Sequence, residues 1–196
     1  MKKVIPIDAK LIPQDAKKMF DGVIFDVFQW QQQMFDGTTE TFEMLRRPDT
    51  VQVICIDEGK VLVLEEEQPH IGRRVNFTGG RVDSSDASIE LAAHREVKEE
   101  TGLSFKELKL ISVEQPQGKI EWFIYTFIAT EMSGREKPEL DAGERITMKW
   151  LNAADLLTAL TSGELLPFGT KKFLSRLTSI EDLLEIPEFE GLQAER

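Results

Sequence analysis

Alternation of hydrophobic and polar residues near the start of the chain predicts a β-hairpin. Residues 23–34 are rich in β-branched and aromatic side chains, and the Asp36-Gly37 pair that follows is a frequent two-residue turn. Residues 38–45 would then form the returning strand. Residues 1–20, with two prolines, give no regular pattern.

A second hairpin is expected directly after this first one. Residues 51–56 and 61–64 are almost entirely apolar, and they flank the polar sequence Asp57-Glu58-Gly59-Lys60. The following residues, 65–76, are mostly polar, and we expect a loop there with a short strand at its end.

The central segment predicts a helix over residues 86–101. Asp86 would be its N-cap, and Gly102 is suited to the left-handed conformation that ends many helices. The rest of the chain predicts strands at 108–113, 121–130 and 146–151, an acidic loop at 131–144, a helix from Asn152 to about Leu160 that ends at Gly163, and a last helix at about 170–184.

This order of strands, one helix, strands and helices indicates a mixed α/β fold rather than an alternating series of strand and helix. We expect residues 1–48 to form a small N-terminal β-rich appendage and residues 49–196 to form the main domain. The first hairpin is too small to bury its own apolar face. It therefore predicts a homodimer, in which a partner chain covers that face.

Composition and charge narrow the function. The chain has 196 residues, of which 41% are hydrophobic and 30% charged, as expected for a globular protein. Its formal net charge is −11, which repels nucleic acid and anionic membrane surfaces. A phosphate compound would need a divalent cation to approach. The ligand is expected to be a small molecule, with no nucleic-acid or membrane partner.

The single cysteine, Cys55, rules out an intrachain disulfide and is expected to be a core thiol. No apolar run is long enough for a membrane span, and the first residues do not have the apolar stretch of a signal peptide. We therefore expect a cytoplasmic protein.

The candidate chemistry is concentrated in residues 79–103. Glu96, Glu99 and Glu100 are spaced to lie on one face of the predicted helix, where like charges repel each other. A hard divalent cation would turn this repulsion into binding. A carbonyl of the Gly79-Gly80 pair upstream could join the ligands, since glycine allows close approach. An acidic run is often just a solvated helix face.

This segment resembles the Nudix box, whose pattern is G-x5-E-x7-R-E-U-x-E-E-x-G-U with U an apolar residue. Residues 95–103, Arg-Glu-Val-Lys-Glu-Glu-Thr-Gly-Leu, match every fixed position of the second half. The first half is one residue longer than the pattern. Its glutamate position is taken either by Asp86, counted from Gly80, or by Ala87, counted from Arg95.

The resemblance implies a Nudix-type α/β/α sandwich and a metal site formed by Glu96, Glu99, Glu100 and the Gly79 carbonyl, with Arg95 as a brace. Residues 43–53 and 141–151 are similar to segments of the ADP-ribose pyrophosphatase subfamily. The implied reaction is hydrolysis of ADP-ribose or a related nucleoside diphosphate sugar. Mg²⁺ suits oxygen ligands best, with Mn²⁺ as the alternative.

The general base is expected from the acidic loop, because the box carboxylates would be occupied by metal. Glu144 is the first candidate, ahead of Glu139 and Asp141, and Glu99 and Arg95 are the box residues expected closest to the reaction. An ordinary solvated loop is the alternative for this segment. Five further residues are candidates for substrate binding: Arg46, Arg47, Arg73, Arg74 and Glu121.

Other readings stay open at this point. A related enzyme could act on a dinucleoside polyphosphate, a nucleoside triphosphate or NADH. A binding-only regulator is a further alternative, although such a protein would be free to lose the three carboxylates. The subfamily resembled here also dimerises by exchanging a sheet like the predicted N-terminal hairpin.

Overall fold

The computed structural model describes the whole chain except residues 1, 70–71, 141, 169–173 and 196. It is a mixed α/β structure with three sheets. Its elements are β1 (Lys2–Ile5), β2 (Lys17–Asp21), β3 (Asp26–Gln33), β4 (Thr39–Arg46), β5 (Thr50–Asp57), β6 (Lys60–Gln68), β7 (Gly72–Asn76), α1 (Ile89–Thr101), β8 (Leu103–Glu114), β9 (Ile120–Glu121), β10 (Ile124–Arg135), β11 (Arg145–Leu151), α2 (Ala153–Ser162), α4 (Glu181–Leu184) and β12 (Leu192–Glu195).

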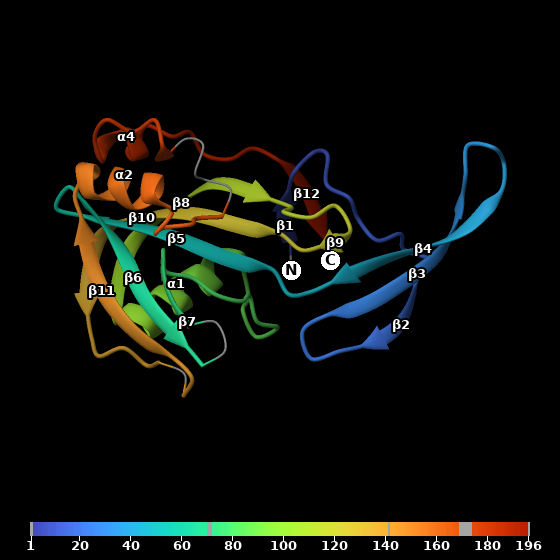
Figure 1. Cartoon of the computed structure of the whole chain (residues 1–196), viewed down its shortest axis with the longest axis horizontal. Coiled ribbons are helices and arrows are strands. Elements are labelled where there is room, and N and C mark those ends of the chain that lie inside the picture. The colour runs from blue at the N-terminus through green and yellow to red at the C-terminus, as the bar shows by residue number, and fades with distance from the viewer. Residues whose placement is uncertain (1, 70–71, 141, 169–173, 196) are drawn as a thin grey trace.

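The main sheet has six strands in the order β11-β6-β5-β10-β8, with β7 paired to β6. β10 and β5 are parallel, and the other pairs are antiparallel. Helix α1 covers one face of this sheet, and α2 and α4 cover the other (Figure 1). Alternate residues of β5 therefore enter different cores: Val53 packs on the α1 side and Ile54 on the α2 side. This is the α/β/α sandwich expected from the sequence.

The N-terminal hairpin forms a separate sheet in the order β2-β3-β4-β9. In Figure 1 it projects away from the main domain. The predicted turn is confirmed: Gly37 has a φ of 86°, and the Asp36 carboxylate accepts the backbone N–H of Thr38 at 2.9 Å. A small cluster of Ile12, Phe28 and Met44 fills the inner face of this sheet.

Strands β1 and β12 pair antiparallel and bring the two ends of the chain together (Figure 1). Ile5 of β1 belongs to the same core cluster as Val51 and Val53 of the main sheet. The sequence pattern did not predict either strand, since each has four residues and its partner lies at the other end of the chain.

Two predicted segments have other boundaries in the structure. The loop expected from residue 65 is strand at its start, because β6 continues to Gln68, while β7 confirms the short strand expected at the end of this segment. The charges that suggested a loop neutralise each other across these strands, where Arg74 pairs with Glu66. β8 begins at Leu103 rather than at 108, because β10 extends to Arg135 and pairs along its whole length.

The predicted N-cap was also wrong. Helix α1 begins at Ile89, and its N-cap is Ser88, whose hydroxyl accepts the N–H of Leu91 at 3.1 Å. The carboxylate of Asp86 is occupied elsewhere, by Arg95. The other caps were predicted correctly, since Gly102 ends α1 with a φ of 70° and Asn152 caps α2.

The last predicted helix, 170–184, lies partly outside the described residues. In the part that is described, Leu174 and α4 (Glu181–Leu184) are helical, with turns and bends between them. The Asp182 carboxylate accepts the N–H groups of Thr178 and Ser179, which supports the start of α4. None of the helices within the described residues is long and apolar enough to cross a membrane.

Candidate active site

The box carboxylates share one face of α1, as the spacing predicts, but their environments differ. Glu100 is buried, Glu96 is mostly buried, and Glu99 is 44% exposed. The backbone N–H of Gly79 donates a hydrogen bond to Oε2 of Glu100 at 2.8 Å. This bond fixes the end of the helix face against the loop that precedes it.

The two glycines permit this close approach. A Cβ on Gly79, whose φ is 146°, would lie 2.1 Å from the carbonyl oxygen of Val51. A Cβ on Gly80 would lie 2.5 Å from a carboxylate oxygen of Glu96. A side chain at either position would push the loop away from strand β5 or from the helix.

Arg95 joins the two halves of the box. Its guanidinium donates two hydrogen bonds to the carboxylate of Asp86, at 3.0 and 2.9 Å, and one to the carbonyl of Arg81 at 2.9 Å. It also donates to Glu96 at 3.0 Å and to Glu99 at 2.9 Å. Asp86, rather than Ala87, therefore supplies the carboxylate of the first half of the box, and the pairing with Arg95 lowers the pKa of Asp86.

The electrostatics of the site favour a bound cation. Burial raises the pKa of Glu100 well above its usual range, against the Gly79 hydrogen bond, and the charges of Glu96, Glu66 and Glu144 raise it further. Burial also raises the pKa of Glu96 to about 7, although Arg95 opposes this. Among the described residues Glu100 forms no salt bridge.

The donor chemistry fits a hard divalent metal, since the box helix offers carboxylate oxygens and the glycine loop offers backbone carbonyl oxygens. Within the described part of the chain, no three His, Cys, Asp or Glu side chains stand together as a ready-made ligand cluster. Arg95 holds both Glu96 and Glu99. A metal would therefore bind carboxylates that this arginine has already oriented.

Glu144 lies at the end of the acidic loop, directly before β11, and it is half-buried. The charge of Glu144 contributes to the raised pKa of Glu100. The pairing of β11 with β6 places Ile146 opposite Glu66, so this end of β11 lies beside the box. Of the other loop candidates, Glu139 is exposed and Asp141 lies outside the described residues.

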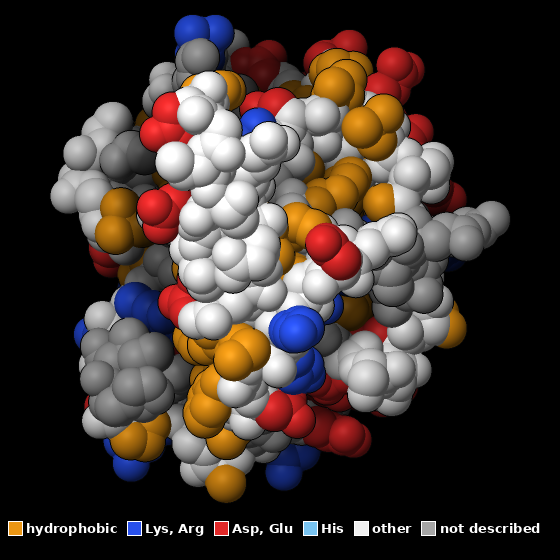
Figure 2. All heavy atoms as spheres, turned by 90° about the vertical axis from the view of Figure 1, so that its right-hand side faces the viewer, with side chains coloured by type: hydrophobic (Ala, Val, Ile, Leu, Met, Phe, Trp, Pro, Cys, Tyr) orange, Lys and Arg blue, Asp and Glu red, His pale blue; other side chains and the backbone are white. Residues whose placement is uncertain are grey.

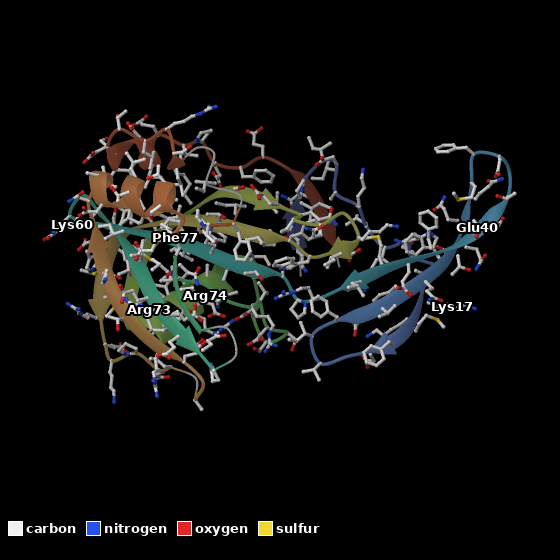
Figure 3. The ribbon with its side chains drawn as sticks, in the orientation of Figure 1. Lys17, Glu40, Lys60, Arg73, Arg74 and Phe77 are labelled. Atoms are coloured by element: carbon white, nitrogen blue, oxygen red, sulfur yellow. The ribbon has the colours of Figure 1, made fainter. Side chains whose placement is uncertain are left out.

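Glu66 is a site residue that the sequence reading missed. It is buried on β6, where Arg74 donates to both of its carboxylate oxygens at 3.1 Å and Asn76 donates at 3.0 Å. Arg74 therefore contacts Glu66 directly, and Glu66 in turn acts on Glu100 through its charge. Arg73 instead pairs with Glu65 and is largely exposed. Figure 3 shows both arginines in the main domain, at the opposite end of the molecule from Glu40.

The remaining predicted residues meet at the junction between the appendage and the main domain. Arg46 contacts a carboxylate oxygen of Glu121 at 3.0 Å, and its guanidinium lies 4.5 Å from the ring centre of Phe28. The other oxygen of Glu121 accepts the N–H of Ile12 at 2.6 Å. Arg47 points to a different partner, the ring of Trp122 at 4.4 Å.

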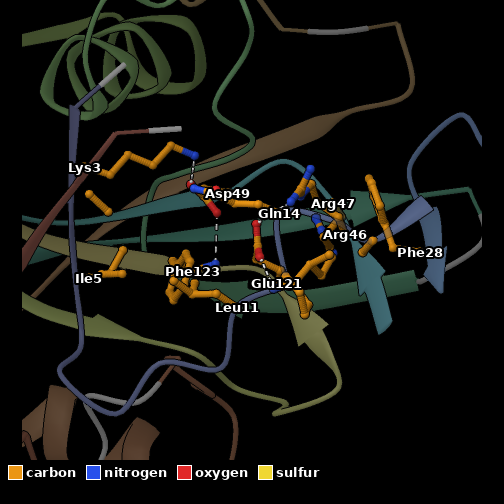
Figure 4. A pocket seen from close by; sticks show the side chains of 14 residues that line it. Lys3, Ile5, Leu11, Gln14, Phe28, Arg46, Arg47, Asp49, Glu121 and Phe123 are labelled. Atoms are coloured by element: carbon orange, nitrogen blue, oxygen red, sulfur yellow. Dashed lines mark hydrogen bonds and ion pairs between the residues drawn. The ribbon is translucent and has the colours of Figure 1, made fainter. Parts of the chain in front are cut away.

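A cavity of about 450 Å³ opens at this junction (Figure 4). Arg46, Arg47 and Glu121 line it together with Lys3 and Asp49. The volume is in the range of small-molecule sites. Asp49, which lines the cavity, accepts the N–H of Val82 with its backbone carbonyl at 2.8 Å. Val82 lies in the loop between Gly80 and α1, so the cavity adjoins the box.

The site consists of a helix that carries Glu96, Glu99 and Glu100 on one face and packs on a Gly-Gly loop within an α/β/α sandwich. The family model of the NUDIX domain matches residues 46–169, more than half of the chain. The chain therefore belongs to the Nudix family and is a Nudix pyrophosphohydrolase.

Individual relatives agree with this assignment. The chain is 27% identical over 152 residues to the ADP-ribose pyrophosphatase of Bacillus subtilis (strain 168), which covers 76% of this chain and 82% of that one. It is 36% identical over 100 residues to the putative nudix hydrolase 1 of Caenorhabditis elegans, covering 51% and 26%. The solved structure of an ADP compounds hydrolase has the same fold, with a TM-score of 0.64 at 18% identity over 87% of this chain and 94% of that chain.

Proposed function

We propose that this enzyme hydrolyses the pyrophosphate bond of ADP-ribose or a related nucleoside diphosphate sugar, giving a nucleoside monophosphate and a sugar phosphate. The observation that carries the proposal is the Glu100 carboxylate, which is buried and forms no salt bridge among the described residues. Its pKa is raised first by this burial and then by the charges of Glu96, Glu66 and Glu144. Such a group of acids is stable when a divalent cation neutralises it. The identity to an ADP-ribose pyrophosphatase supports the choice of substrate.

In this proposal Mg²⁺, or Mn²⁺ as the alternative, is held by the side chains of Glu96, Glu99 and Glu100 and by the carbonyl of Gly79. When bound, the metal would neutralise the diphosphate and make water more acidic. Arg95 orients Glu96 and Glu99 through hydrogen bonds of 3.0 and 2.9 Å. These bonds restrict the rotation of both carboxylates, so the two side chains are oriented before a metal binds.

Glu144 is the proposed general base, accepting the proton of the attacking water. Its place beside Glu100 and outside the α1 face supports this role, since it can approach the reacting water without occupying a metal-binding position. The β11–β6 pairing begins at Arg145, the residue after Glu144, and therefore holds Glu144 at a fixed end of the loop.

Substrate binding is assigned to Arg46, Arg47, Arg73, Arg74 and Glu121. The cavity at the junction would receive the organic part of the substrate, with arginines at its rim for the phosphates. Arg73 and Arg74 would act at the other side of the box, where they already pair with Glu65 and Glu66.

A substrate panel with MgCl₂, scored by product identity, tests this proposal. ADP-ribose and other nucleoside diphosphate sugars should be cleaved to a monophosphate and a sugar phosphate. Faster cleavage of a dinucleoside polyphosphate, a nucleoside triphosphate or NADH would move the activity to that class and reject the sugar assignment. Binding of these compounds without any metal-dependent turnover would instead favour a regulatory domain.

A further inference from the structure

One side of the cavity at the junction is formed by residues 6–16, the strap, which join β1 to β2. The structure describes all of these residues, and none of them belongs to a helix or a strand. Five residues of the strap line the cavity: Leu11, Ile12, Pro13, Gln14 and Ala16. Figure 4 shows two of them, Leu11 and Gln14, among the side chains around the cavity. The position of the strap therefore sets the width of the cavity.

Gln115, in the loop between β8 and β9, makes a cyclic pair of hydrogen bonds with the strap backbone. Its Oε1 accepts the N–H of Lys10 at 2.7 Å, and its Nε2 donates to the carbonyl of Lys10 at 2.8 Å. Nε2 also donates to the carbonyl of Ile120 at 2.9 Å. The acceptor and both donors of one side-chain amide are therefore used at once, and they tie the strap to the start of β9.

Glu121, the residue after Ile120, holds the strap two residues further along. One of its carboxylate oxygens accepts the N–H of Ile12 at 2.6 Å, and the other contacts Arg46 at 3.0 Å. Within the described residues, the hydrogen bonds that join the strap to another element come from Gln115 and Glu121. The strap therefore has two points of attachment.

The two points of attachment differ in their exposure. The bond from Ile12 to Glu121 is buried and charge-assisted, which makes it the stronger one. The bonds between Gln115 and Lys10 are exposed to solvent. Segments with few buried contacts and exposed hydrogen bonds have low free energies of local opening. Gln115 therefore determines whether the outer part of the strap stays in place, while Glu121 holds the inner part.

We propose that Gln115 is a positioning residue of the substrate site, which holds the strap against the cavity and thereby determines how tightly the organic part of the substrate binds. Gln115 is not among the described residues that line the cavity, so it acts through the strap and not by contact. The inference rests on the proposed function for the placement of that organic part in the cavity. The box carboxylates lie on a different element, α1, so Gln115 should affect substrate binding and leave the chemical step unchanged.

Hydrogen exchange of the full-length protein, without metal or substrate, tests the attachment of the strap. Gln115→Met removes the amide at nearly constant side-chain length, and Gln115→Asn keeps the amide but is one carbon too short to bridge the same groups. In both variants the backbone amides of the strap should exchange about tenfold faster or more, because hydrogen bonds that hold it are lost. Gln117→Met, at an exposed position of the same loop, is the control and should exchange like the unaltered protein. Unchanged exchange of the strap in both Gln115 variants would overturn the proposal.

Steady-state kinetics with MgCl₂, on the compound of the substrate panel that is cleaved fastest, tests the effect on the site. KM should rise by about three- to tenfold in both Gln115 variants, because binding must then reorder the strap. The value of kcat should stay within about twofold of that of the unaltered protein, and Gln117→Met should change neither quantity. A lower melting temperature or a lower kcat with unchanged KM would indicate a merely structural role and would overturn the proposal.

The outcomes separate this inference from the proposed function. A raised KM for a compound other than a nucleoside diphosphate sugar would uphold the role of Gln115 and reject the sugar assignment. Cleavage of ADP-ribose with the same KM in all variants would uphold the proposed function and overturn the inference. If no compound is cleaved, calorimetric titration of ADP-ribose takes the place of KM. Weaker binding by the Gln115 variants would then uphold the inference, and no binding by the unaltered protein would overturn both.

Discussion

Arg95 donates hydrogen bonds to two carboxylates of its own helix, to Asp86 and to a backbone carbonyl of the preceding loop. An exposed ion pair contributes little to stability, but this side chain is mostly buried and satisfies several acceptors at once. These bonds raise the pKa of Arg95, with Asp86 as the largest cause. The residue therefore keeps its charge at every pH of interest and fixes the loop conformation that the longer first half of the box adopts.

The first prediction concerns two buried carboxylates of α1, Glu96 and Glu100. Glu100→Gln and Glu96→Gln should each lower turnover by about a hundredfold or more, since a metal ligand contributes several kcal/mol to charge stabilisation. Without metal, both variants should melt at the same or a higher temperature, because a buried, mutually repelling charge is removed. Thermal melts with and without MgCl₂ and steady-state kinetics measure both effects.

The control for this prediction is Glu107→Gln, a glutamate exposed on β8. It should keep full activity and the full rise in melting temperature on adding MgCl₂. Near-normal hydrolysis by both box variants would reject the assignment of the metal site.

The second prediction separates three roles for Glu144. If it is the general base, Glu144→Gln should lower kcat by about a hundredfold or more while metal affinity and KM change little. A metal ligand would instead lose metal affinity together with rate. A merely connecting loop would change neither quantity. Metal titration and steady-state kinetics on this one variant distinguish the three, and an unchanged kcat would end the case for Glu144.

At the scale of elements, α1 shows how a local signal positions a site. The hydroxyl of Ser88 caps the helix, and Asp86 is thereby free to bind Arg95. The third prediction follows: Ser88→Ala should lower the free energy of unfolding by about 1 kcal/mol, the usual effect of losing an N-cap. Ser85→Ala, in the exposed part of the same loop, should stay within about 0.5 kcal/mol in the same urea titration. An equal loss in both variants would contradict the cap assignment.

Elements set by neighbouring residues could be predicted from the sequence, and those set by distant pairing could not. The Asp36-Gly37 turn, the Gly102 cap and the Asn152 cap each depend on a few adjacent residues. By contrast, β1 becomes a strand only because β12 pairs with it from the far end of the chain. The extension of β6 to Gln68 likewise depends on β7.

The same distinction holds for the candidate site. The spacing of Glu96, Glu99 and Glu100 on a helix is local, and the sequence alone indicated their common face. Glu66 escaped the sequence reading because its significance arises from strand pairing, which places it on β6 opposite Ile146 at the end of the acidic loop, where its charge raises the pKa of Glu100. Glu66 stands in a run of three glutamates, and alternation along a strand was the signal that could have singled it out.

At the scale of the whole molecule, the two ends of the chain support the junction between the appendage and the main domain. Lys3 of β1 pairs with the buried carboxylate of Asp49, and the same carboxylate accepts the N–H of Phe123. The backbone carbonyl of Asp49 accepts the N–H of Val82. One residue thus links the N-terminal strand, the box loop and the entry to β10. Because these contacts also line the cavity, the position of the appendage and the shape of the proposed substrate site depend on each other.

The appendage also exposes apolar side chains that the rest of this chain leaves uncovered. Phe28 and Met44 are buried against Ile12, so the N-terminal segment covers part of the face that the sequence suggested would need a partner. Six other large hydrophobic side chains between positions 19 and 35 remain exposed. Figure 2, which views this end of the molecule, shows hydrophobic side chains on the surface. The six are Met19, Phe20, Val23, Ile24, Phe25 and Phe35.

The last prediction is therefore that the protein is a homodimer built through this end of the molecule. Contiguous apolar patches on soluble proteins mark interaction sites, and a projecting hairpin has little core of its own. Sedimentation at micromolar concentration should give the mass of two chains. Replacing both Phe20 and Val23 by Glu should shift it to the mass of one chain, because buried charges without partners oppose association. Met132→Glu, at an exposed position of β10 in the main domain, should leave the dimer intact. A mass of one chain for the unaltered protein would refute the prediction, and dimers that persist in the double variant would place the interface elsewhere.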